Sequence, residues 1–355
     1  MKILVAPLNW GLGHASRCVP LVRRLLDEGH EVVLGGDGES LTLLRKHFPK
    51  LRYTYLAPLN LRYSKGTRQV WAMLKALPLL LLWSIKDHAM LKAVLREEPF
   101  DQVISDNRFG LYINHQSSIV KSSIETVYIT HQLHIMLPKG WRWAEGIVSR
   151  LHARIYTRFN KVWVPDYADP DRSLAGDLSH PAQMANGKWQ LANITYIGPL
   201  SRFGNQSSNR QSSNRQSSNR QSYDIVAVLS GLEPHRTLLE QDILARYVNH
   251  KSQIINHKSE VLLVQGLMNR PNTRIKRGNI TIVPYLRDEE LVPALLGAKH
   301  IIARSGYSTL MDLDALGLLN DKSQIINHKL ELLPTPGQPE QEYLAKRIEQ
   351  KTLFS

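Results

Sequence analysis

The sequence has little cysteine and no long apolar run. Cys18 is the only cysteine among 355 residues, which excludes a disulfide scaffold and fits a reducing compartment. We interpret Cys18 as a small core residue, the alternative being a reactive thiol. The most apolar stretch, residues 76–83, is far shorter than the roughly 20 residues that span a bilayer. No apolar signal sequence follows Met1, so we expect a cytoplasmic protein.

Motifs for metal binding and for nucleic-acid binding are also missing. The net charge is +14, but seven basic residues lie in short repeats, and +7 remains without them. The other basic residues are spread out and form no stripe interleaved with aromatic residues, which argues against nucleic acid as a partner. The remaining charge favours nucleotide diphosphates, lipid phosphates or an acidic membrane face.

Short apolar runs alternate with helical stretches along the chain. The first half has expected strands at 2–7, 31–35, 51–56, 100–105, 126–130 and 161–164, and expected helices at 15–28 and 40–47. The second half has expected strands at 223–229, 260–264, 279–283, 299–303 and 331–334. This alternation predicts an α/β fold of two Rossmann-like domains facing a cleft, with ligands at the carboxyl ends of the strands. We assign residues 1–200 and 223–355 to the two domains, and take 161–164 as the last strand of the first.

Three low-complexity insertions interrupt this pattern. Residues 206–222 repeat Gln-Ser-Ser-Asn-Arg, and we expect them to be disordered within a linker at 201–222. Residues 249–259 and 322–329 share the string Lys-Ser-Gln-Ile-Ile-Asn-His-Lys. Short insertions of this kind fit loops, where added length costs little free energy. Their histidines match no metal-ligand spacing, so we expect no metal site.

The strand before Ala303-Arg-Ser-Gly306 ends directly at the start of a helix. Such a turn aims unpaired N–H groups and the positive end of a helix dipole at one point, which suits a diphosphate. Ser308 and Thr309 either donate to phosphate oxygens or cap the helix. Asp312 lies two turns further on, either within reach of a ribose or simply solvated. The next strand leads to Pro334–Gln341, whose polar side chains can hold sugar hydroxyls.

These two segments resemble the inverting glycosyltransferases with two Rossmann-like domains, the GT-B type. Within that type they are similar to family 28, which includes the N-acetylglucosaminyltransferase of the lipid-linked peptidoglycan precursor, and to the C-terminal domains of UDP-glycosyltransferases. Further matching segments are Asn9–Arg17 (NWGLGHASR), Val226–Arg236 (VAVLSGLEPHR) and Ile282–Leu291 (IVPYLRDEEL). Two features depart from the family, namely the extra loop at 322–329 and an apparently shortened C-terminus, and both bear on whether the chain is active.

The resemblance implies transfer of a hexosyl group from a UDP-sugar to an acceptor hydroxyl, with inversion and without a metal or other cofactor. His14 is the expected catalytic base, since histidine accepts protons near neutral pH, although it can instead only bind substrate or orient its loop. Asp106 is a rival base, with a turn role as the preferred interpretation. The expected substrate-binding residues are Gly11, Gly13, Ser230, Gly231, Tyr285, Arg304, Ser305, Gly306, Ser308, Thr309, Asp312, Gln338, Glu340 and Gln341.

Other interpretations of the whole chain stay open. One is a nucleotide-sugar 2-epimerase of the same fold, and another is a degenerate relative that no longer catalyses a reaction. The acceptor is either lipid-linked or a small molecule. One or two long helices over 68–95 either pack on the core, which we slightly favour, or lie on the inner face of a membrane beside a lipid-linked acceptor.

Overall fold

The computed structural model describes residues 1–59, 69–113, 124–182, 193–204, 223–248, 259–319 and 328–354. The chain divides into two compact units. One consists of Met1–Leu200 with Gly337–Glu340, and the other of Ser201–Pro336 with Gln341–Ser355. The three repeat insertions, 206–222, 249–259 and 322–329, lie almost entirely outside the described residues, so the expectations about them stay predictions.

The first unit is built on a seven-stranded parallel sheet with the strand order β3-β2-β1-β4-β5-β6-β7. Its strands are β1 (Lys2–Pro7), β2 (Glu31–Gly36), β3 (Tyr53–Tyr55), β4 (Gln102–Asp106), β5 (Glu125–Ile129), β6 (Lys161–Val164) and β7 (Ile194–Tyr196). The central strands are continuous apolar runs because helices cover both faces of the sheet. In register, Leu4 lies between Val33 and Val103, and all three are buried.

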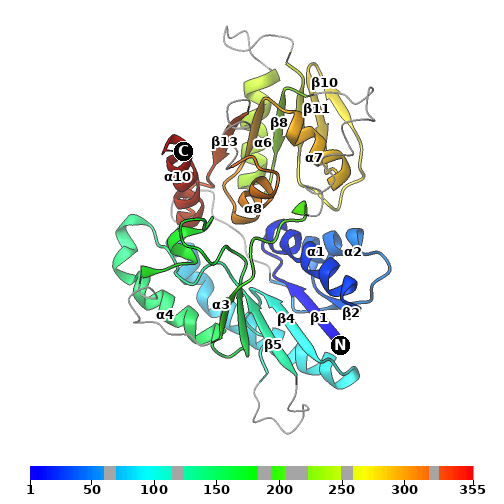
Figure 1. Cartoon of the computed structure of the whole chain (residues 1–355), viewed down its shortest axis with the longest axis vertical. Coiled ribbons are helices and arrows are strands. Elements are labelled where there is room, and N and C mark those ends of the chain that lie inside the picture. Colours follow the sequence, from blue (N-terminus) through cyan, green and yellow to red (C-terminus); the bar gives the residue numbers. More distant parts are fainter. Residues whose placement is uncertain are drawn as a thin grey trace. The chain divides into compact units, whose positions relative to one another are not determined.

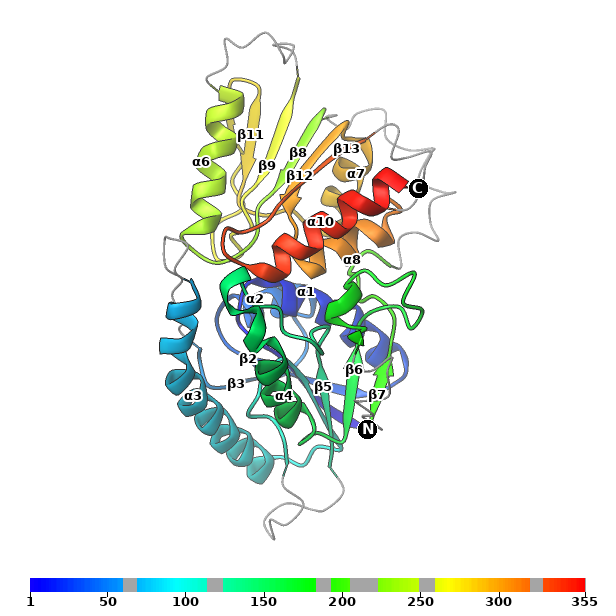
Figure 2. The same cartoon turned by 90° about the vertical axis from the view of Figure 1, so that its left-hand side faces the viewer.

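Helices α1 and α2 cover one face of this sheet, and α3 and α4 cover the other (Figures 1 and 2). The helical elements are α1 (Leu12–Asp27), α2 (Gly38–His47), α3 (Gln69–Glu97), α4 (Glu145–Tyr156) and the 3-10 turns η1 (Lys139–Ala144) and η2 (Gly176–Leu178). Leu91 of α3 and Tyr156 of α4 pack in one core with Leu4 of β1. No helix within the described residues has both the length and the apolar character needed to cross a membrane.

The second unit has a six-stranded sheet with the order β10-β11-β9-β8-β12-β13, parallel except for the edge strand β10. The strands are β8 (Ile225–Val228), β9 (Val261–Val264), β10 (Ile275–Arg277), β11 (Ile280–Val283), β12 (His300–Arg304) and β13 (Lys329–Leu333). The helices are α6 (His235–Val248), α7 (Asp288–Gly297), α8 (Tyr307–Ala315) and α10 (Pro339–Phe354). Buried side chains from β8, β9, β11 and β12 pack against α6 to form the core.

The predicted α/β fold with two parallel sheets is confirmed. The prediction that 161–164 is the last strand of the first half was wrong, because β7 pairs with β6 beyond it. Strand β7 has three residues with a polar threonine at its centre, so it gives almost no apolar signal in the sequence. The exposed strand β10 escaped prediction for the same reason. Helix α1 begins at Leu12, three residues before the predicted start, which places Gly13 and His14 in its first turn.

Candidate active site

The loop after β1 leads into α1 at the carboxyl edge of the first sheet. Gly11 is the N-cap of α1 and has a φ of 78°, a conformation that side-chain-bearing residues rarely adopt. Gly11 thus ends the short loop at 8–11 between β1 and α1, and His14 falls in the first turn of the helix with a side chain that is 14% exposed. Strand β4 ends beside β1, because Pro7 pairs with Asp106. The two strand ends thus bring His14 and Asp106 together.

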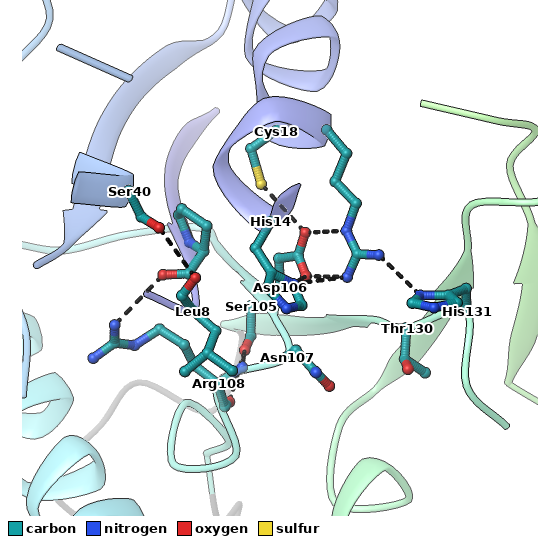
Figure 3. A network of polar contacts seen from close by, with 12 residues as sticks. Leu8, His14, Cys18, Ser40, Ser105, Asp106, Asn107, Arg108, Thr130 and His131 are labelled. Carbon is teal, nitrogen blue, oxygen red and sulfur yellow. Dashed lines mark hydrogen bonds and ion pairs between the residues drawn. The ribbon is translucent and has the colours of Figure 1, made fainter. Parts of the chain in front are cut away.

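Asp106 is completely buried and lies at the centre of a polar network (Figure 3). Its Oδ1 atom is 2.8 Å from His14 Nδ1, and the Arg17 guanidinium binds both of its carboxylate oxygens. The thiol of Cys18 also donates to it, over 3.6 Å. Burial alone raises the pKa of Asp106, but Arg17 and His14 outweigh burial and hold that pKa well below its usual range. Asp106 is therefore an ionised carboxylate, which can only accept hydrogen bonds.

The Asp106 carboxylate determines which nitrogen of His14 carries the proton. With lone pairs on both Nδ1 and Oδ1, a separation of 2.8 Å would be repulsive, so Nδ1 must donate. Arg17 also approaches Nδ1, at 3.1 Å, but the same NH2 group has a closer acceptor in Asp106 Oδ1. In neutral His14 the lone pair is therefore on Nε2. That tautomer suits a general base.

A second buried network supports the loop that carries Gly11. Arg108 is fully buried and forms ion pairs with Asp37 and Asp87. Asp37 accepts a 3.0 Å hydrogen bond from the side chain of Asn9, on the loop after β1. Burial raises the pKa of Asp87, while Arg108 acts to lower it. Arg108 follows Asp106 by two residues. The short segment at the end of β4 therefore supports the loop after β1, through Asp37 and Asn9, and also binds His14, through Asp106.

His131 follows β5 and lies at the same edge of the first sheet as His14 and Asp106. Its Nδ1 atom is 3.1 Å from an Arg17 nitrogen, and its Nε2 atom is 2.8 Å from Glu340 Oε1. The side-chain amide of Gln132 donates to the other oxygen of Glu340. Residues 337–340 group with the first unit, so these contacts lie within it. The predicted role of Glu340 in holding sugar hydroxyls stays a prediction.

In the second unit, the other predicted binding residues gather at the carboxyl ends of parallel strands. Ser230 and Gly231 follow β8, Arg304 ends β12, and Tyr285 follows β11. Gly231 is exposed and has a φ of 100°, a conformation that favours glycine. Because these strands are parallel, the predicted residues share one edge of the sheet. The positive charge of Arg236 is compensated by Glu233 and Glu240.

Arg304 is a buried guanidinium held by main-chain carbonyls. Its nitrogens donate to the carbonyls of His235 at 2.9 Å, Pro334 at 3.0 Å and Leu333 at 3.4 Å. Its Nε atom is buried and has no hydrogen-bond partner among the described residues. Burial lowers the pKa of Arg304, although the group stays charged because arginine is effectively always protonated. Within the described part of the chain this positive charge is hydrogen-bonded to carbonyls and to no carboxylate, which favours an anionic ligand nearby.

The turn after β12 is joined to the turn after β13. Ser305 Oγ donates to the carbonyl of Gln341, and Gln341 Oε1 accepts from the main-chain nitrogen of Thr335, both at 2.8 Å. Gly306 is the N-cap of α8, so Ser308 and Thr309 lie in the first turn rather than at the cap. Their hydroxyls stay predicted phosphate contacts. Gly337, with a φ of 76°, allows the second turn, in which Gln338 is half-buried.

Asp312 is mostly buried, so the alternative that it is simply a solvated helix residue was wrong. It accepts a 2.7 Å hydrogen bond from Ser201 and forms an ion pair with Arg202 at 3.4 Å. Burial raises the pKa of Asp312, while Arg202 acts to lower it. The carboxylate is therefore already bound inside the second unit, and its contact with a ribose stays a prediction.

Two curated relatives align with nearly the whole chain, whereas no protein-family model matches it. A protein of Methanosarcina acetivorans called "Uncharacterized glycosyltransferase" is 24% identical over 376 residues, covering 99% of this chain and 84% of the relative. A protein of the same description from Methanosarcina mazei is 23% identical over 368 residues, with the same coverage. The similarity therefore includes both units.

Solved structures with the same architecture share little sequence with it. The glycotransferase of kitacinnamycin has a TM-score of 0.54 and 12% identity, and covers 98% of this chain and 84% of its own. LpCGTa in complex with UDP has a TM-score of 0.52 and 10% identity, with coverages of 98% and 82%. The fold is that of the GT-B glycosyltransferases. The narrower resemblance to family 28 stays a prediction.

Sequence reasoning about this GT-B fold missed two functional candidates, Arg17 and His131. Arg17 was not among the predicted site residues, although its spacing of three residues from His14 places both on one side of a helix. His131 was not among the predicted binding residues. A basic residue three positions after a candidate helical base is the signal that identifies such a partner.

Proposed function

We propose that the chain is an inverting glycosyltransferase that moves a hexosyl group from a UDP-sugar to an acceptor hydroxyl. The observation that carries this proposal is the 2.8 Å contact between His14 Nδ1 and Asp106 Oδ1 at the ligand-binding edge of a GT-B domain. His14 Nε2 takes the proton from the acceptor hydroxyl as its oxygen attacks the anomeric carbon. The bond from that carbon to the diphosphate breaks, and UDP leaves with the electron pair.

The leaving diphosphate is the proposed ligand of the turn formed by Arg304, Ser305 and Gly306. Three features support this role, namely the buried guanidinium, the start of α8, where the N-cap Gly306 provides no side-chain hydrogen bond, and the positive end of the helix dipole. Fixed donors aimed at developing negative charge stabilise a transition state without a metal ion. Activity that persists in a chelator is the expected result. UDP is proposed because the similar structure of LpCGTa holds it.

The acceptor is proposed to be lipid-linked, with peripheral contact between the first unit and a membrane. Helix α3 buries Trp83, whose indole nitrogen donates to the Ala57 carbonyl, so its inner face packs on the core. Its outer face exposes Leu81, Leu82 and Ile85 at 66%, 63% and 67%. Further exposed apolar residues lie on η1 and α4 together with exposed basic residues. They are Trp143, Ile147 and Leu151, with Arg142, Arg150 and Arg154. Apolar side chains with nearby basic groups suit an anionic lipid surface.

Product analysis with the full chain tests the proposal. We expect a UDP-sugar and an acceptor to give free UDP and a glycoside of inverted anomeric configuration. His14→Gln should lower kcat by about 10²- to 10⁴-fold, the usual contribution of a general base, while UDP binding measured by calorimetry is unchanged. His30→Gln is the matched control, because His30 is a surface histidine just beyond the other end of α1.

Two outcomes would contradict transferase activity. Formation of a 2-epimeric nucleotide sugar without free UDP would identify an epimerase of the same fold. Binding of UDP with no turnover across a panel of sugars and acceptors would identify a non-catalytic relative.

A further inference from the structure

Arg17 contacts both histidines and the buried carboxylate at the edge of the first sheet. Its Nε and NH2 groups bind Asp106, and its NH1 group lies 3.1 Å from His131 Nδ1. The guanidinium is nearly fully buried, with 3% of the side chain exposed. One rigid fork thus joins the helix α1, the end of β4 and the segment that follows β5. A lysine, with its single ammonium group, cannot bridge these positions in the same way.

Arginine fixes the tautomer of His131 because all of its nitrogens donate and none accepts. The Arg17 contact therefore requires a lone pair on His131 Nδ1. The proton of the neutral ring must then be on Nε2, which is 2.8 Å from Glu340 Oε1. The ionised state of Glu340 agrees with this assignment. Burial raises its pKa, but His131 and the cations near it outweigh burial and lower that pKa, so it accepts. Burial lowers the pKa of His131, which favours the neutral ring, while Glu340 acts to raise that pKa.

His14 has the reverse arrangement, although it also contacts Arg17. Its Nδ1 atom faces Asp106, an ionised acceptor, and so carries the proton. Arg17 stabilises this state indirectly, by orienting Asp106 and keeping it charged. The charged groups that face the pair are Arg17 and Asp106, with Glu340 beyond His131 and the neutral thiol of Cys18 behind Asp106. Burial raises the pKa of Cys18 well above its usual value, so it adds no charge.

We propose that Arg17 is a positioning residue that holds His14 and His131 in opposite neutral tautomers. His14 then offers a lone pair on Nε2, and His131 offers an N–H group on Nε2. The edge of the sheet thus contains one histidine that takes a proton and one that donates a hydrogen bond to an anionic oxygen. The role of His14 as a catalytic base rests on the proposed function, whereas the assignment of the two tautomers does not.

Two-bond ¹H–¹⁵N NMR spectra of the full chain at mildly alkaline pH test the assignment directly, since they distinguish Nδ1–H from Nε2–H rings. His14→Gln and His131→Gln each remove one set of signals and so identify both rings. We expect the Nδ1–H form for His14 and the Nε2–H form for His131. The same tautomer at both rings would overturn the proposal, whatever the protein catalyses.

Arg17→Lys tests whether arginine is the cause. We expect His14 to keep Nδ1–H, because Asp106 still accepts from it, and the share of the Nδ1–H form at His131 to rise, because only Glu340 then favours its Nε2–H form. We also expect kcat to fall about a hundredfold with little change in KM for the donor. A purely structural role for Arg17 predicts unchanged tautomers and contradicts the proposal. If Arg17→Lys does not fold, the wild-type spectrum still decides the assignment. Opposite tautomers in a protein that transfers no sugar would support this inference and reject the proposed function.

Discussion

Ser305 donates its hydroxyl hydrogen to the main-chain carbonyl of Gln341 over 2.8 Å. The two residues are 36 positions apart in the chain. The bond joins the turn after β12, the proposed diphosphate contact, to the first turn of α10, the proposed sugar contact. Parallel neighbours in a sheet bring their carboxyl ends to one edge, and this hydrogen bond fixes the distance between the two turns there.

Ser305→Ala should therefore loosen the donor site as well as the fold. Removing a buried hydroxyl partner costs about 1 kcal/mol of unfolding free energy. We expect KM for the UDP-sugar to rise severalfold while kcat changes less, because the base in the first unit is untouched. Urea denaturation and steady-state kinetics measure the two effects. Thr42→Ala is the control, since it removes a 2.9 Å hydroxyl–carbonyl bond from α2 and should leave KM unchanged.

Arg304→Met should weaken UDP binding strongly. The substitution keeps much of the aliphatic bulk but removes the buried positive charge, and hydrogen bonds to charged groups contribute about 1.5–3 kcal/mol. Calorimetry should therefore show a loss of roughly 10- to 100-fold in UDP affinity. Arg246→Met is the matched control in the same unit, because Arg246 pairs with Glu331 and Asp242 at the surface. Equal UDP affinity in both variants would place the diphosphate elsewhere.

The sequence predicted the parallel sheets because buried parallel strands are apolar along their whole length. The run Lys2–Pro7 was predicted with its observed bounds, as was Lys161–Val164. The sequence did not predict β7 and β10, because each strand has three residues and little or no buried apolar surface. The start of α1 was placed too late because glycines lower helix propensity, while the strand before it forces an immediate turn.

The candidate site was predictable where its residues are neighbours in sequence and not where tertiary contacts decide. The pattern Gly-x-Gly-His identified His14 as a candidate base. Only the pairing of β1 with β4 brings Asp106 to that ring, and a single sequence does not contain this register. The bonds of Asp312 to Ser201 and Arg202 could not be predicted either, because they join a helix to a segment 111 residues earlier.

Membrane contact through the exposed face of α3 predicts that polar substitutions on this face weaken binding to lipid vesicles. Replacing Leu81, Leu82 and Ile85 together by glutamine removes apolar area that is already in water, so stability should change little. We expect binding to vesicles containing anionic lipid to fall at least tenfold in co-sedimentation, and wild-type binding to weaken with salt. Leu238→Gln, at an exposed leucine of α6, is the control. Equal vesicle binding by wild type and the triple variant would exclude this face.

His152 predicts how stability depends on pH. The ring is buried beside Tyr128 and Tyr156, and burial lowers the pKa of His152 from 6.5 to about 4. Between these values the unfolded chain binds more protons than the folded one, so stability is complete above the unfolded pKa and is lost as pH falls. From about pH 7 to about pH 5 this single residue should cost about 2 kcal/mol.

His152→Phe preserves the aromatic packing and leaves Tyr128 its 2.6 Å hydrogen bond to Asn107. In urea denaturation at the two pH values, the variant should lose about 2 kcal/mol less than wild type, because phenylalanine has no proton to bind. His30→Gln, at the surface, should behave like wild type. The same pH dependence in His152→Phe and wild type would mean that other groups cause the acid instability, the buried His131 being the next to test, since burial also lowers its pKa.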